Sequence, residues 1–144
     1  MNIRPLTAQD YPQWRRLWQA YLAFYHTTLD DAVFETTFAR LTSDDHPQQN
    51  ARVAETGGTL QGLVHYIYHP HNWHQNNVIY LQDLYTQPDN RGEGIGRALI
   101  EAVYKVADDS GAPSVYWLTQ DDNHQARRLY DNIAKLTPFV KYQR

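Results

Sequence analysis

Helical spacing of hydrophobic residues dominates the first third of the chain. A short apolar stretch at 3–6 favours a strand, and Thr7-Ala8-Gln9-Asp10 after it has the form of a helix capping box. Aromatic and aliphatic side chains then repeat three and four positions apart as far as Tyr25, which is the spacing of one helix face. A second predicted helix cap at 28–31 precedes another run of apolar residues at helical spacing. Two consecutive helices are therefore expected.

The middle of the chain changes to a strand pattern. Segments 51–55 and 60–68 flank Gly57-Gly58, a pair that favours a tight hairpin turn. After a polar loop, residues 78–86 form a third run rich in β-branched and aromatic side chains. Because the connections are too short for a crossover, these strands are expected to pair antiparallel.

The last third alternates helix and strand. A helix is expected from Ile95 until Gly111-Ala112-Pro113, a strand at 114–119, a helix through Ala134 capped by Asp122 or Asn123, and a closing strand at 139–143. The order of elements predicts an α/β fold with a central mixed, mostly antiparallel sheet and about four flanking helices. Residues 1–144 are expected to form one domain.

Composition narrows the function classes. Apolar residues make up 42% and charged residues 20% of the 144, as in ordinary globular proteins. No apolar window is long enough to span a bilayer and no secretory signal opens the chain, so a cytoplasmic location and no membrane partner are expected. The absence of cysteine excludes disulfides, thiolate metal sites and a cysteine nucleophile. A net charge of −3 without a basic patch argues against a nucleic-acid partner.

The segment with the clearest chemistry is Arg91-Gly92-Glu93-Gly94-Ile95-Gly96, between the run 78–86 and a helix. Glycines there permit a tight turn and leave amide hydrogens accessible at the positive end of the helix, which suits a pyrophosphate. Arg91 adds a charge-assisted contact. A Walker loop needs Lys-Ser/Thr after its last glycine, and a dinucleotide fingerprint needs another glycine spacing in an early βαβ unit, so neither fits.

This loop resembles the Gln/Arg-x-x-Gly-x-Gly/Ala coenzyme A loop of the GCN5-related N-acetyltransferases (the GNAT superfamily), and the order of elements is similar along the whole chain. Segments 113–117 and 123–130 resemble, more narrowly, the yeast histone and polyamine acetyltransferase homologue group and its bacterial relatives. The resemblance implies direct transfer of an acetyl group from acetyl-coenzyme A (acetyl-CoA) to a primary amine, without a metal. The acceptor stays open between a polyamine, a lysine side chain and an amino acid, and relatives suggest a homodimer.

The resemblance also implies roles for individual residues. Leu84, Tyr85 and Thr86 match a splayed strand whose backbone pairs with the pantetheine arm and the acetyl carbonyl. Asn123 matches a side chain that touches the cofactor, and Tyr130 matches a tyrosine near its sulfur that protonates the departing thiolate. The pyrophosphate cradle comprises Arg91, Gly92, Glu93, Gly94, Ile95, Gly96 and Arg97.

The group that accepts the proton of the amine stays open. Polyamine acetyltransferases of this family carry a glutamate where this chain has Gln82, and an alkylammonium with a pKa of about 10.4 must still lose a proton. Asp83 is the adjacent candidate, although strand alternation turns it to the other face unless the strand bulges. Glu55, Asp30, Asp31 and a water chain are the alternatives. The missing carboxylate also leaves open a non-catalytic acetyl-CoA sensor or oligomerisation module.

Two further groups of side chains invite a functional interpretation. The histidines between His65 and His74 lack the spacing of a metal site, and an exposed loop with one or two substrate-facing histidines is expected. Trp14, Trp18, Tyr21 and Tyr25 are expected to pack in the core rather than to form an aromatic cage for a cation. Aromatic residues further along the same helix border the acceptor pocket in the resembling family, so these are candidates to line it: Tyr21, Phe24 and Tyr25.

Overall fold

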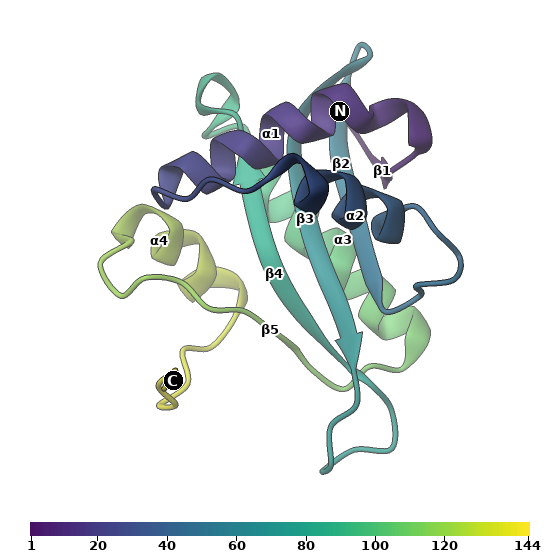
Figure 1. Ribbon diagram of the computed structural model, residues 1–144. Coiled ribbons are helices and arrows are strands. Elements are labelled where there is room, and N and C mark those ends of the chain that lie inside the picture. Colours follow the sequence, from purple (N-terminus) through teal and green to yellow (C-terminus); the bar gives the residue numbers. More distant parts are fainter.

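A five-stranded sheet organises the chain, with its strands side by side in the order in which they occur in the sequence (Figure 1). In this computed structural model, which describes residues 1–144, the strands are β1 (Asn2–Pro5), β2 (Gln49–Thr56), β3 (Thr59–His69), β4 (Val78–Thr86) and β5 (Val115–Tyr116). The first four pair antiparallel and β5 joins β4 in parallel. The predicted mixed, mostly antiparallel sheet is confirmed.

Helices cover both faces of the sheet (Figure 1). The four helices are α1 (Tyr11–Phe24), α2 (Asp31–Leu41), α3 (Ile95–Ser110) and α4 (His124–Ile133), with short 3-10 turns η1 (Ala8–Asp10) and η2 (Pro88–Asn90). On one face, α1 and α2 bury an aromatic cluster that includes Trp14, Trp18 and Phe34. On the other, α3 buries an aliphatic cluster. None of the helices is both long and apolar enough to cross a bilayer.

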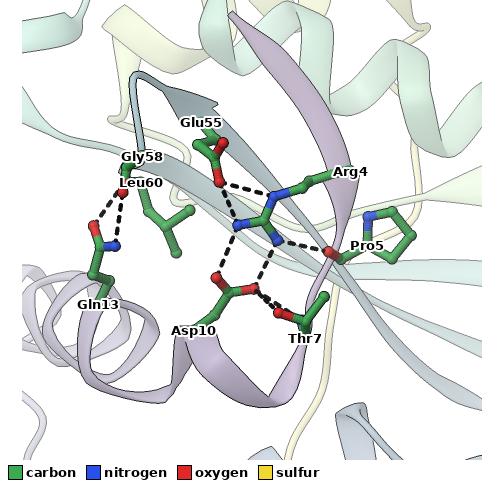
Figure 2. A network of polar contacts seen from close by, with 8 residues as sticks. All are labelled: Arg4, Pro5, Thr7, Asp10, Gln13, Glu55, Gly58 and Leu60. Atoms are coloured by element: carbon green, nitrogen blue, oxygen red, sulfur yellow. Dashed lines mark hydrogen bonds and ion pairs between the residues drawn. The ribbon is translucent and has the colours of Figure 1, made fainter.

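A network of charged groups fixes the point where β1 ends and α1 begins (Figure 2). The guanidinium of Arg4 donates to both carboxylate oxygens of Asp10, at 2.7 and 2.8 Å, and also to Glu55 on β2. The backbone amide of Thr7 donates to Asp10 as well, which confirms the predicted capping box. Hydrogen bonding from Arg4 is the largest influence that lowers the pKa of Asp10 below its usual value. The junction between β1 and α1 is therefore held by the buried Asp10 carboxylate, which is paired with Arg4.

Most predicted boundaries agree with the structure, but the end of the chain does not. The run 78–86 is β4 as predicted, and α3 ends before Gly111, which has a positive φ of 73°. The predicted strand at 114–119 is shortened to two residues. The predicted strand at 139–143 is wrong, because this segment pairs with no neighbour and stays irregular. A strand needs a partner for its backbone hydrogen bonds, and none lies beside it.

Candidate functional site

The sheet opens between β4 and β5, and a narrow pocket lies in the opening. The two strands pair only at Ile79–Val115 and Tyr80–Tyr116, so the rest of β4 has no neighbour on that side. Figure 1 shows the chain after β5 diverging from β4 towards α4. The pocket is lined by side chains from the end of α1, from β4, from the segment after β5 and from α4: Tyr21, Tyr25, Leu81, Gln82, Leu84, Trp117, Leu118, Thr119 and Tyr130.

A β-bulge at Gln82 determines the direction in which the side chain of Asp83 points. In the pairing with β3, Leu81 lies opposite Tyr66 and Asp83 lies opposite His65, so Gln82 has no partner. One extra residue shifts the alternation of side chains by one. Leu81 therefore packs in the cluster under α3, whereas Asp83 points towards α1. The sequence left this outcome conditional on a bulge, and the bulge is present.

Asp83 ends a buried chain of polar groups beneath α1. Its Oδ2 accepts hydrogen bonds from Trp18 Nε1 at 3.2 Å and contacts His65 Nδ1 at 2.8 Å. Trp14 Nε1 donates to His65 Nε2 at 2.9 Å. An indole N–H only donates, so His65 Nε2 must carry a lone pair and the ring proton sits on Nδ1, where it is donated to Asp83. His65 is thus a neutral ring in a fixed tautomer, and Asp83 is a buried carboxylate held by two N–H donors.

The charge of this carboxylate influences three tyrosines. Burial is the main cause that raises the pKa of Tyr21, and the charge of Asp83 raises it further. Burial followed by the charge of Asp83 also raises the pKa values of Tyr25 and Tyr80. Of these three, Tyr21 and Tyr25 line the pocket.

The glycine loop forms an open turn before α3. Gly92 and Gly94 have positive φ angles of 84° and 81°, and no atom lies within 4 Å of the position that a Cβ would take on either. The amides of Gly92, Glu93 and Gly94 make no hydrogen bond within the protein, and no side chain caps α3. Ile95 is buried, so only its backbone faces this turn. Free amides above open space suit an anionic phosphate group.

Arg91 and Arg97 flank this turn in different ways. Arg91 Nε donates to the carbonyl oxygen of Thr86 at 3.1 Å, which brings the loop back against the end of β4. Arg97 pairs with Glu101 one helical turn later, at the exposed surface. Both side chains lie within reach of solvent beside the free amides.

Tyr130 closes the far side of the pocket. It comes from α4 and packs edge-to-face on Trp117, with the ring centroids 5.3 Å apart. Burial raises its pKa to about 12, with a smaller contribution from Tyr25. Asn123 caps α4, because its side chain accepts from the amide of Ala126. The prediction that Asp122 or Asn123 caps the last helix is thereby confirmed, with Asn123 as the cap.

Other predicted candidates lie elsewhere. Glu55 belongs to the Arg4 network, and Asp31 forms an ion pair with Arg15 on α1. Trp14 and Trp18 are buried in the core as predicted. Phe24 does not line the pocket and is 55% exposed, whereas the neighbouring candidates Tyr21 and Tyr25 do line it.

Sequence reasoning missed the part that His65 plays. It grouped this residue with the loop histidines, but His65 is only 4% exposed and lies directly opposite Asp83 on the neighbouring strand. Its place in the middle of an apolar strand run was the available signal, because a polar side chain there must be buried against a partner.

Comparison with known sequences gives consistent results. The model of the acetyltransferase (GNAT) family matches residues 11–133. The D-amino-acid N-acetyltransferase HPA3 of Saccharomyces cerevisiae is 38% identical over 144 residues, 99% of this chain and 89% of the relative. The thialysine N-epsilon-acetyltransferase of Sus scrofa is 39% identical over 73 residues, 51% of this chain and 41% of the relative.

Solved structures share the fold at low sequence identity. The aminoglycoside N-acetyltransferase AAC(6')-Iy, solved in complex with CoA, has a TM-score of 0.84 at 18% identity, with 99% of this chain and 93% of that chain covered. A ribosomal-protein-alanine N-acetyltransferase from Brucella melitensis biovar Abortus 2308 has a TM-score of 0.78 at 22% identity, covering 99% and 98%.

Proposed function

Because the chain belongs to the acetyltransferase (GNAT) family, we propose that residues 1–144 act as one N-acetyltransferase domain that moves the acetyl group of acetyl-CoA directly onto a primary amine. The observation that carries this proposal is the junction of two features at one end of β4. An open glycine turn with free amides lies beyond Thr86, and an aromatic pocket lies beside Leu81–Leu84. A long substrate with a phosphate at one end and a reactive group at the other suits both at once.

The glycine turn fits the pyrophosphate of the substrate. The free amides of Gly92, Glu93 and Gly94 and the first amides of α3 supply donors, and the helix dipole adds positive potential. Arg91 and Arg97 supply charge at the rim. The side chain of Ile95 is buried in the core beneath the turn. A Cβ at Gly96 would lie 3.7 Å from Leu129 and 3.9 Å from Thr86.

The unpaired edge of β4 then receives the pantetheine arm. Backbone groups of Leu84, Tyr85 and Thr86 on this side have no strand neighbour, since β5 pairs only further back. Amides on this unpaired side are the proposed donors to the acetyl carbonyl, where negative charge develops as the amine attacks. Asn123, which caps α4, is the proposed side-chain contact with the cofactor.

Tyr130 is the proposed acid. A tyrosine whose pKa is raised to about 12 keeps its proton at neutral pH and can donate it to the departing sulfur. Asp83 is the proposed acceptor of the proton that the ammonium loses, because it is the buried carboxylate next to the pocket. Of the alternatives, Glu55 and Asp31 are occupied by arginine partners, whereas Asp30 and a water chain stay open.

The proposed acceptor is a primary amine of a small molecule or of a peptide. Relatives are named for D-amino acids and for thialysine, both of which carry amines. Aromatic rings and a nearby carboxylate favour a cation at the mouth of the pocket. A polyamine, a lysine side chain and a free amino acid each present one.

The test is release of free thiol from acetyl-CoA. The protein is incubated with acetyl-CoA and a panel of D-amino acids, thialysine, spermidine and a lysine peptide, and thiol is followed by a chromogenic reagent. Thiol release that depends on one amine supports the proposal. Tight binding of CoA with no thiol release for any amine would favour the alternative, a non-catalytic sensor.

We also infer a homodimer from the end of the chain. Large apolar side chains after α4 are exposed: Leu136 by 70%, Phe139 by 83%, Val140 by 76% and Tyr142 by 93%. The neighbouring strand β5 pairs with β4 alone, so its outer edge is unpaired. The apolar segment of one copy can therefore pair with the unpaired edge of β5 in a second copy.

A further inference from the structure

The strands β4 and β5 separate directly after one pair of tyrosines. The two strands pair at only two positions, and the second of these is Tyr80–Tyr116, where Tyr116 is the last residue of β5. The very next residue on each strand, Leu81 on β4 and Trp117 after β5, lines the pocket. The pair Tyr80–Tyr116 therefore marks the point at which the opening between the two strands begins.

A stack of the two tyrosine rings adds to this short backbone pairing. The preceding residues on the two strands, Ile79 and Val115, pack in or against the aliphatic cluster under α3. Successive side chains alternate between the faces of a sheet, so Tyr80 and Tyr116 lie on the other face. Their rings are stacked, with centroids 5.0 Å apart and planes inclined by 16°. The stack therefore holds β5 to β4 on the face that α3 does not cover.

His69 anchors the Tyr116 ring of this stack. It is the last residue of β3, and its Nδ1 lies 2.8 Å from the carbonyl oxygen of Pro70. A carbonyl oxygen only accepts, so Nδ1 carries the hydrogen, and Nε2 of the neutral ring accepts from the Tyr116 hydroxyl at 2.8 Å. The His69 ring also packs edge-on against Tyr116, with centroids 5.8 Å apart. Three side chains thus join β3, β4 and β5.

We propose that His69, Tyr80 and Tyr116 form a clamp that holds β5 at the start of the opening and keeps the adjoining edge of β4 free for the pantetheine arm. This inference rests on the proposed acetyl transfer, which makes acetyl-CoA the ligand that enters the opening. The three are positioning residues, because they act through β5 and the chain after it rather than by contact with the substrate.

A fixed opening strengthens the binding of a ligand that needs it. If β5 moved freely, the segment after it would lie against β4 in some molecules and away from it in others. The apparent affinity of a ligand falls with the fraction of molecules that are competent to bind it. The segment after β5 also supplies Trp117 to the pocket, so its position shapes the pocket as well. The clamp is therefore expected to increase the affinity for CoA.

The first measurement is hydrogen exchange in the free protein, followed by NMR. The amide of Ile79 donates to the carbonyl oxygen of Ser114 at 2.9 Å, so it reports when β5 separates from β4. Tyr116→Phe keeps the ring stack and removes the hydroxyl bonded to His69. Loss of one neutral hydrogen bond should speed this exchange by about threefold to tenfold. Tyr116→Ala also removes the stack and should speed it further, with no change in α1 and α2.

The second measurement is calorimetric affinity for CoA, with steady-state rates on the same samples. Tyr116→Phe and His69→Leu should each weaken CoA binding by about threefold to tenfold, and should raise the KM for acetyl-CoA more than they lower kcat. The double variant should lose little more than either single one, because the same hydrogen bond is absent in all three. His69→Gln is the conservative variant. Its amide oxygen can accept from the Tyr116 hydroxyl and should restore much of the affinity.

Tyr11→Phe is the matched control for the loss of a tyrosine hydroxyl. Tyr11 lies at the start of α1, and its hydroxyl accepts from Arg15 at 3.0 Å. The substitution should leave both the exchange of the Ile79 amide and the affinity for CoA at their wild-type values.

The outcomes separate the clamp from the proposed function. Wild-type affinity for CoA in Tyr116→Phe overturns the clamp, whether or not exchange at Ile79 is faster, because the contact is then only structural. Additive losses in the double variant, or faster exchange throughout the chain, overturn it as well. Tight CoA binding without thiol release for any amine would overturn acetyl transfer and leave the clamp standing. Absence of CoA binding in the wild type would overturn both.

Discussion

At the scale of single residues, removal of the Tyr130 hydroxyl tests whether this residue has a catalytic role or only a packing role. Tyr130→Phe keeps the ring against Trp117 and removes only the proton donor. Turnover should fall by about tenfold to a thousandfold, whereas CoA affinity should change little because phosphate contacts lie elsewhere. Initial rates and calorimetric titrations on the same samples measure both.

A second tyrosine provides the control for this prediction. The hydroxyl of Tyr104 donates to the carbonyl oxygen of Ile133 and joins α3 to α4 away from the pocket. Tyr104→Phe should cost about 1 kcal/mol of unfolding free energy and leave turnover intact. If Tyr130→Phe behaves like Tyr104→Phe, Tyr130 is not the acid.

Asp10 gives a prediction about pH and stability. Its pKa is lowered in the folded state, chiefly by Arg4, so the carboxylate stabilises the fold above the ordinary aspartate pKa. This contribution is lost as the pH falls through the lowered folded pKa. Asp10→Asn should therefore cost about 2 kcal/mol at pH 7 and progressively less under acidic conditions. Urea unfolding at a series of pH values measures it, and a pH-independent difference would contradict the pairing shown in Figure 2.

At the scale of elements, the turn before α3 tests cofactor binding. Gly94→Val places a side chain in the open space above free amides and forces a strained positive φ. CoA should raise the melting temperature of the wild type, because a ligand of the folded state stabilises it. The variant should show little or no such rise.

Gly58 is a matched control for backbone strain. It has a φ of 80°, close to the 81° of Gly94, and it also has open space at the Cβ position, but it lies in the turn between β2 and β3. Gly58→Val should lower the melting temperature of the free protein yet keep the CoA-induced rise. Equal CoA responses in both variants would remove the glycine turn from the binding site.

The sequence predicted elements better than it predicted their irregularities. Periodicity of apolar residues sufficed for α1, α3 and β4, because burial of one face determines each of them. The bulge at Gln82 was named only as a condition for the orientation of Asp83. A bulge depends on the pairing with β3, which no local sequence pattern specifies. His65 shared this limit, because its partners Trp14 and Asp83 lie 51 and 18 positions away. The role of the glycine turn was predicted from its residues as well as from the resemblance, and the role of Tyr130 from the resemblance; both remain predictions.

At the scale of the whole molecule, the same two tryptophans stabilise the aromatic cluster of the core and the candidate site. Trp14 and Trp18 pack α1 on the sheet and also donate to His65 and Asp83. The same packing sets the end of α1, from which Tyr21 enters the pocket. Substitutions that loosen α1 are therefore expected to affect acceptor activation as well as stability.

The exposed end of the chain gives the last prediction, on assembly. If Phe139 and Val140 pair with β5 of a second copy, the wild type should sediment at twice the 16.9 kDa mass of one chain. The double variant Phe139→Ser/Val140→Ser should sediment as a monomer at low concentration. Within one chain these side chains touch little, so the fold should lose no more than about 0.5 kcal/mol. Trp73→Ser removes an equally exposed apolar side chain, 84% accessible, from the loop between β3 and β4 and should leave the dimer intact. A wild type that sediments as a monomer at every concentration would show that the exposed segment has another role.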